Sequence, residues 1–154
     1  MQTKYIFVII LSLFFSGCET IRPTFSDCTH SITAVEEGTR VTLRTLDNGD
    51  TAQASLNGVS ALCNERVDTI DIKMKVGLKL VRKLDQNVAA VELELPLIIA
   101  ILDSNDKVKS YESVSYKMAF PENKSTIYPV IKPKTKMPIN GRAIITLAPK
   151  IVKP

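Results

Sequence analysis

The sequence contains one histidine, no tryptophan and few aromatic residues, which make up 6% of its 154 residues. A single imidazole, that of His30, cannot form the histidine clusters that bind zinc, and it excludes most histidine-dependent catalytic arrangements within one chain. The Gly-x-Ser-x-Gly, His-Glu-x-x-His and Cys-x-x-Cys motifs are also absent. We therefore expect no metal, no cofactor and no enzymatic activity.

The composition disfavours both disorder and a multidomain architecture. Hydrophobic residues make up 45% of the chain, and the formal net charge is only +4. Chains that remain unfolded have fewer apolar residues and a larger net charge. The length suits one domain and leaves no room for a large two-domain enzyme.

The first residues have the layout of a secretory signal. Lys4 and the amino terminus provide positive charge, and residues 5–15 form an apolar run interrupted only by Ser12. Eleven residues in a helix span about 16 Å, whereas the hydrocarbon core of a bilayer needs about 20 residues. We interpret residues 1–17 as a signal peptide rather than a membrane-spanning anchor.

The end of this run, Phe15-Ser16-Gly17-Cys18, resembles the lipobox of bacterial lipoproteins. In that family cleavage occurs before the cysteine, whose thiol and new amino group are then acylated. The resemblance implies that Cys18 is the lipidated first residue of the mature chain, and several acyl chains would hold a soluble domain at a bilayer. Glu19 stands where an aspartate tends to retain Gram-negative lipoproteins in the inner membrane, so the resemblance implies the outer membrane, with the domain facing the periplasm. The alternative is an ordinary signal peptide with a cysteine near its cleavage site.

Two further cysteines, Cys28 and Cys63, form an even pair, which in an oxidising compartment predicts a disulfide. Two free buried thiols are the alternative. A metal site is disfavoured because His30 is the only imidazole and no second cysteine lies at ligand spacing. A disulfide-bonded sulfur cannot act as a nucleophile, so we interpret His30 as a surface residue rather than the partner of a catalytic Cys28.

Period-two alternation of apolar and polar residues predicts strands rather than helices. The clearest examples lie within residues 70–80, 91–101 and 108–120, with polar turns at 85–87 and 103–106. The predicted core residues are Ile70, Ile72, Met74, Val76, Leu78, Leu80, Val91, Leu93, Leu95, Leu97, Ile99, Ile101, Val108, Ser110, Val114, Tyr116, Met118 and Phe120. If these segments pair as consecutive hairpins, Glu92 lies opposite Lys79 on one side and Lys117 on the other.

Shorter strands are predicted at Ser31–Val35, Thr51–Leu56, Val59–Cys63, Ser125–Lys132 and Arg142–Ala148, with turns at 47–50 and 57–58. Pro133 and Pro138 cannot donate hydrogen bonds to a sheet, which assigns residues 121–138 to an edge or to loops. About seven short strands predict an all-β fold over residues 28–149, an antiparallel two-sheet β-sandwich, with a small β-barrel as the alternative. Residues 18–27 then form a tether and residues 150–154 a tail.

Glu92 and Glu94 are two carboxylates on one face of a predicted strand, about 7 Å apart. A glycosidase needs a carboxylate pair at comparable separation, so a periplasmic envelope-glycan hydrolase is one alternative function. Residues i and i+2 on a strand point in parallel, however, and neighbouring lysines keep both groups ionised. We expect these two side chains to form cross-strand charge pairs.

Acidic residues are absent from Lys124 onwards, whereas seven basic residues lie in that segment. Among them Lys132, Lys134 and Lys136 alternate, so an extended segment presents all three on one side. Such a stripe could bind an anionic glycolipid or another acidic envelope component. Its alternative role is to protect a sheet edge from aggregation. The compartment and the lack of interleaved aromatic residues disfavour nucleic acid as a partner.

The cysteine layout and the alternating strands resemble small uncharacterised outer-membrane lipoproteins of alphaproteobacteria. The shared landmarks are Cys18, Cys28, Gly58, Cys63 and Leu95–Leu102. The resemblance implies the location and the fold, and it provides no catalytic residues to transfer. The function these features favour is that of a non-enzymatic, lipid-anchored outer-membrane lipoprotein that binds another envelope component or supports its assembly.

Overall fold

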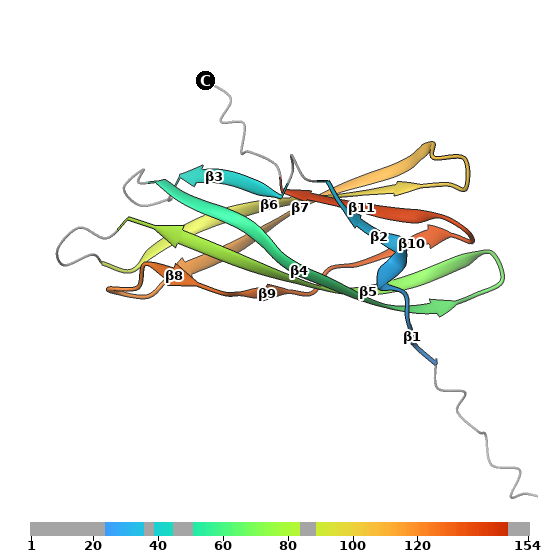
Figure 1. Cartoon of the computed structure of the whole chain (residues 1–154), viewed down its shortest axis with the longest axis horizontal. Coiled ribbons are helices and arrows are strands. Elements are labelled where there is room, and N and C mark those ends of the chain that lie inside the picture. The colour runs from blue at the N-terminus through green and yellow to red at the C-terminus, as the bar shows by residue number, and fades with distance from the viewer. Residues whose placement is uncertain (1–23, 36–38, 45–50, 84–88, 148–154) are drawn as a thin grey trace, which may run out of the picture.

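The strands of the chain form two sheets in an elongated sandwich (Figure 1). The computed structural model describes residues 24–35, 39–44, 51–83 and 89–147. The seven-stranded sheet contains β1 (Ser26–Asp27), β3 (Arg40–Arg44), β4 (Thr51–Glu65), β5 (Thr69–Arg82), β8 (Thr126–Ile127), β9 (Val130–Ile131) and β10 (Lys134–Pro138). The four-stranded sheet contains β2 (Ile32–Ala34), β6 (Val91–Leu102), β7 (Val108–Phe120) and β11 (Arg142–Leu147), and the 3₁₀ turn η1 (Thr29–Ser31) joins β1 to β2.

Strand pairing confirms the predicted antiparallel two-sheet sandwich. In the four-stranded sheet the order is β2-β11-β6-β7, and only β2 with β11 is parallel among the described pairings. In the seven-stranded sheet β4 and β5 form the centre, with β1 and β3 along β4 and with β8, β9 and β10 along β5. Residues 121–138 therefore supply an edge, as the prolines predict. Within the described ranges, no helix is long and apolar enough to cross a membrane.

The described residues contain eleven strands rather than about seven. One reason is that prolines divide the edge segment into β8, β9 and β10. Pro129 and Pro133 cannot donate to β5, but their carbonyl groups still accept hydrogen bonds from Leu78 N (2.9 Å) and Met74 N (3.0 Å). A second reason is β3, whose five residues alternate between polar and apolar but are not among the predicted strands. The turns predicted at 47–50 and 85–87 lie outside the described residues.

The core lies between the sheets and consists largely of the alternating residues that the sequence predicts. The even-numbered residues of β5 from Ile70 to Leu80 are buried, as are the odd-numbered residues of β6 from Val91 to Ile101. In β7 the prediction holds only toward the end, where Phe120 is fully buried. The first six residues of β7 are exposed on both faces, and Val108 is 62% exposed, so this half of the strand lies beyond the packed core.

The predicted register between the long strands is only partly right. β5 and β6 belong to different sheets, so Glu92 does not lie opposite Lys79. Alternation cannot distinguish a connection that crosses between sheets from a hairpin. β6 and β7 do pair around the predicted turn at 103–106, but Glu94, rather than Glu92, lies opposite Lys117. A shift of two residues keeps core residues facing core residues, which is why the parity of the pattern does not detect it.

The predicted turn at Asn57-Gly58 is instead a bulge within one continuous strand. The β4–β5 register shifts between Leu56 and Val59, and Gly58 has φ +120°. A Cβ atom at Gly77, on the facing strand, would lie 3.3 Å from the carbonyl oxygen of Asn57. Two glycines therefore allow β4 to absorb an extra residue without ending, as bulges do in long twisted strands.

Arg82 is a buried charge at the end of β5, only 6% exposed. Its guanidinium donates to three backbone carbonyls, those of Lys124 (2.9 Å), Ala89 (3.0 Å) and Pro121 (2.9 Å). It also lies 5.0 Å from the centroid of the Phe120 ring. Because a buried charge is tolerated only when its donors are satisfied, Arg82 fastens the segments that follow β5 and β7 to the same end of the core.

Candidate functional site

The predicted disulfide between Cys28 and Cys63 is present, with the two Cα atoms 5.8 Å apart and both residues buried. Cys28 directly follows β1, and the β1–β4 pairing places Ser26 beside Cys63. The bond therefore fastens the start of the folded domain to the end of β4. Ser26 and Asp27, within the range assigned to the tether, already form β1, whereas Cys18 and Glu19 lie outside the described residues.

The two candidate catalytic residues lie on the same strand. Glu92 and Glu94 lie on the outward face of β6, and Glu94 is the cross-strand partner of Lys117. The register thus puts a lysine across from one of the two carboxylates, and the charge pair itself stays a prediction. His30 is exposed on η1, which agrees with its interpretation as a surface residue.

The predicted stripe is exposed along one edge of the seven-stranded sheet. Lys132, Lys134 and Lys136 all face outward, and they alternate with the buried Ile131, Thr135 and Met137. Their environments are not equivalent, because Lys136 alone of the three forms an ion pair with a carboxylate among the described residues.

Lys136 belongs to a small ion cluster around Asp71. Lys136 Nζ lies 3.8 Å from Asp71 Oδ1, and Arg66 Nε donates to Asp71 Oδ2. The hydrogen bond from Arg66 lowers the pKa of Asp71, and the charge of Lys136 acts in the same direction. The positive charge of Lys136 is therefore partly neutralised within the fold.

The two remaining stripe lysines meet two further lysines of β5. Lys134 is the direct cross-strand partner of Lys73. The β5–β9 pairing joins Ile131 to Val76 in the same register, which places Lys132 opposite Lys75. We call Lys73, Lys75, Lys132 and Lys134 the lysine quartet. From general strand geometry, its corners lie about 5 Å apart across the strands and about 7 Å apart along them.

Alternation does predict that Lys73 and Lys75 face outward, but it does not reveal their partner strand. The signal that could have found the quartet is the combination of two lysine series with the same spacing, one on a central strand and one on a proline-bounded edge. Without the order of strands in the sheet, the lysines of β5 and those of the edge segment indicate only two separate solvent-exposed surfaces.

A shallow groove of about 350 Å³ lies over the lysine quartet. All four quartet residues line it, together with Asp27, Ser60, Ala61, Leu62, Met74 and Pro133. The Asp27 carboxylate accepts a 2.9 Å hydrogen bond from Thr29 N, which lowers the pKa of Asp27 and keeps this carboxylate ionised at neutral pH. One carboxylate against four ammonium groups leaves the groove positively charged.

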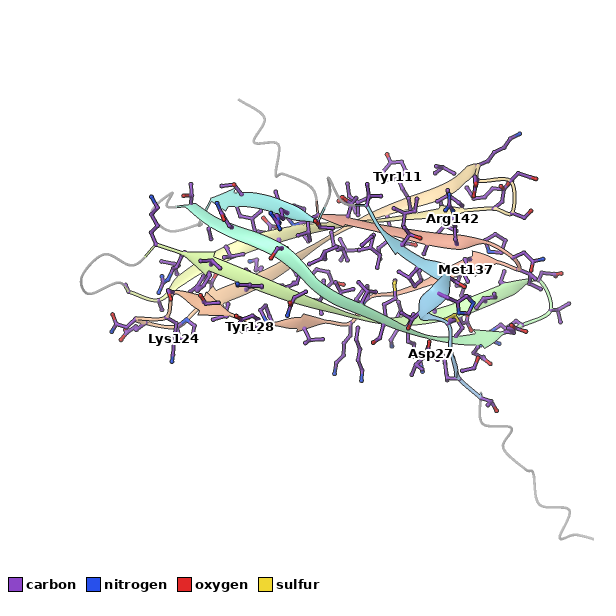
Figure 2. The ribbon with its side chains drawn as sticks, in the orientation of Figure 1. Asp27, Tyr111, Lys124, Tyr128, Met137 and Arg142 are labelled. Carbon is purple, nitrogen blue, oxygen red and sulfur yellow. A yellow bond between two sulfur atoms is a disulfide. The ribbon has the colours of Figure 1, made fainter. Side chains whose placement is uncertain are left out.

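The chain enters the domain beside this groove, which Asp27 of β1 lines. Phe25, immediately before β1, has the Nζ atom of Lys73 3.7 Å from its ring centroid. Figure 1 shows β1 at the margin of the seven-stranded sheet, and Figure 2 shows Asp27 well separated from Lys124 along the long axis. The basic residues from Lys124 onwards therefore do not form one patch, and Arg142 pairs with Asp106 at 3.0 Å on the other sheet.

No protein-family model, curated protein or solved structure matches this chain. The resemblance to bacterial lipoproteins thus stays a prediction from the residues that carry it, and the function has to be argued from the chain's own chemistry.

Proposed function

We propose that this chain is a lipid-anchored lipoprotein of the outer membrane whose β-sandwich binds another envelope component, or supports its assembly, without catalysing a reaction. The observation that carries the proposal is the buried Cys28–Cys63 disulfide. Such bonds persist in compartments beyond the cytoplasmic membrane and are rare in the reducing cytosol. Together with the lipobox-like segment Phe15-Ser16-Gly17-Cys18, the disulfide supports export followed by anchoring at Cys18.

The length of the predicted tether fits this role. Six residue steps separate Cys18 from Thr24, the first described residue. Six extended residues reach about 20 Å at most. Acyl chains on Cys18 would therefore hold the sandwich close to the bilayer surface while leaving it outside the hydrocarbon.

Mass spectrometry of the protein purified from membranes tests the anchor. We expect a mature chain that begins at Cys18 and carries acyl chains on it. A Cys18→Ser variant is the matched control and should be missing from the washed membrane fraction. Recovery of the native protein with residues 1–17 uncut and a free Cys18 thiol would contradict the proposal.

Separation of the two membranes by density tests the location. We expect the native protein in the outer membrane and a Glu19→Asp variant shifted toward the inner membrane. If the native protein already sediments with the inner membrane, the outer-membrane part of the proposal is wrong.

Incubation with purified cell-wall glycan tests the absence of catalysis. We expect no hydrolysis by the native protein. Hydrolysis that disappears in Glu92→Gln or Glu94→Gln variants would replace the binding role with the hydrolase alternative. The binding role itself is tested by deleting the gene, which should change the response of the envelope to detergent.

A further inference from the structure

The lysine quartet pairs like charges twice in succession, Lys73 with Lys134 and Lys75 with Lys132. Like charges directly opposite each other destabilise a sheet. Among the described residues, no carboxylate forms an ion pair with any of these four lysines. Within the part of the chain that the structure describes, the quartet therefore forms a positive surface that no ion pair neutralises.

Protection of a sheet edge does not explain this surface. Lysines on β9–β10 could serve that purpose, because this segment is an edge. Lys73 and Lys75, however, lie on β5, which has hydrogen-bonded neighbours on both sides. Half of the quartet thus stands where there is no edge to protect.

Apolar side chains flank the quartet on the same outward face. Leu62 of β4 is 44% exposed and lines the groove, and Val130 of β9 is 55% exposed. Ammonium groups on flexible aliphatic stems beside exposed apolar side chains suit the boundary between lipid headgroups and water.

The start of the domain places this surface on the side of the predicted anchor. β1 pairs with β4 at Cys63 and Leu62, and Leu62 lines the groove. Phe25 contacts Lys73, so the chain leaves the domain toward Cys18 directly beside the quartet. With about 20 Å of chain at most between Cys18 and Thr24, the headgroups around the anchor would lie within reach of the quartet.

We propose that the lysine quartet binds the phosphate groups of anionic lipid headgroups in the membrane that holds the chain, so that the outer face of the seven-stranded sheet lies against the bilayer. This proposal rests on the anchoring at Cys18 proposed above. The attraction is electrostatic and depends on proximity, since it falls off within a Debye length. The proposed contact orients the domain so that the four-stranded sheet faces away from the membrane.

Acetylation of lysines, followed by mass spectrometry, tests the proposal on the native lipidated protein in vesicles. One vesicle type contains phosphatidylcholine alone, and the other contains phosphatidylcholine with phosphatidylglycerol. We expect acetylation of the quartet to slow about fivefold in the second type, the factor that corresponds to about 1 kcal/mol per lysine near an anionic surface. Acetylation of Lys107 and Lys117, which are exposed on the side of the four-stranded sheet, should not change. Equal quartet rates in both vesicle types would overturn the proposal.

Two double variants test whether the quartet itself causes the protection, and added inorganic phosphate distinguishes lipid headgroups from free phosphate. In a Lys75→Gln/Lys132→Gln variant, Lys73 and Lys134 should lose their protection by phosphatidylglycerol. A Lys107→Gln/Lys117→Gln variant, changed on the side of the four-stranded sheet, should keep it. Equal protection in both variants contradicts the proposal. Inorganic phosphate added to phosphatidylcholine vesicles should protect nothing. If it protects the quartet as well as phosphatidylglycerol does, the site takes free phosphate and the proposed membrane contact is wrong.

The same digests show whether Cys18 is acylated, so failure of the anchor is visible independently. If Cys18 is bare, the protein is added to preformed vesicles of both compositions. Protection of the quartet by phosphatidylglycerol alone then still supports the headgroup surface, and no protection overturns it.

Discussion

The outward faces of the two sheets carry their charges differently. On the four-stranded sheet, cations lie beside carboxylates: Glu94 is opposite Lys117, and Lys109 lies 3.3 Å from Asp103. On the seven-stranded sheet, the lysine quartet places cations against cations, and the cluster around Asp71 sets one carboxylate against two cations. The charges on the four-stranded sheet lie close to opposite charges of the same chain. The outward face of the seven-stranded sheet carries an excess of positive charge that folding does not require. This excess makes it the candidate binding face.

The two sheets also differ in how they are held. The seven-stranded sheet contains the disulfide, the bulge at Gly58 and three short edge strands. The long pair of the four-stranded sheet, β6 with β7, runs in register up to a shift beside its turn. The experiments below test whether the two sheets also differ in how strongly substitutions within them change the stability of the protein.

Removal of the disulfide should have the largest effect. The bond joins residues 35 apart in the sequence, and closing a loop of that length contributes about 4 kcal/mol in the chain-entropy model. A Cys28→Ala/Cys63→Ala variant should lose about this much free energy of unfolding in urea titrations. Hydrogen exchange should then rise first in β1 and the end of β4. Equal loosening of β6 and β11 would show that the two sheets do not differ in this way.

Substitution of Gly58 should come next. A Cβ atom there meets nothing within 4 Å, so the cost of Gly58→Ala arises from the backbone, at φ +120°, rather than from a clash. We expect a loss of about 1–3 kcal/mol in the free energy of unfolding. Asn57→Ala, an exposed neighbour within the bulge, is the control and should change stability by less than about 0.5 kcal/mol. Equal effects of the two substitutions would mean that the positive φ is not maintained.

Charge reversal should have opposite signs on the two sheets. Lys75→Glu turns a like-charge pair with Lys132 into an attractive one and should raise the free energy of unfolding by about 0.2–1 kcal/mol. Glu94→Lys, opposite Lys117, should lower it by a similar amount. Both changes should shrink in high salt, because exposed pairs are screened. A loss of stability in Lys75→Glu would contradict the assignment of repulsion to the quartet.

Low pH should reduce the free energy of unfolding through both sheets, and the effect of each residue should be the smallest of those predicted here. The hydrogen bond from Arg66 lowers the pKa of Asp71, and those from the backbone N–H groups of Lys107 and Asn105 lower the pKa of Asp103. Because these pKa values are lower in the folded state, the stabilisation is fully present above the unfolded value of 3.8 and is lost as the pH falls through the folded value. Asp71→Asn and Asp103→Asn should each flatten the acid side of a stability–pH curve. An unchanged curve would show that the carboxylate is not engaged.

The sequence predicts which way side chains face far better than which strands pair. Alternation correctly assigns Ile72 and Met74 to the core and Lys73 and Lys75 to the outside. It cannot show that Lys73 meets Lys134, because this contact depends on the order of strands in the sheet. The Asn-Gly dipeptide at 57–58 has the same local chemistry in a hairpin turn and in a bulge, so only the long β4–β5 pairing decides between them. The disulfide was predictable by counting cysteines, because Cys18 has a separate predicted role.

The position of the disulfide also determines how the domain responds to pulling. Tension applied upstream of Thr24 reaches the two residues of β1 and then Cys28, where the covalent link transfers it to Cys63. Separation of β1 from β4 would release only Ser26 and Asp27, because η1 and β2 follow the crosslinked Cys28 in the chain. A domain anchored by its amino-terminal end would thus transmit the force into β4, its longest strand. The segment η1, which leads to the four-stranded sheet, would bear little of it.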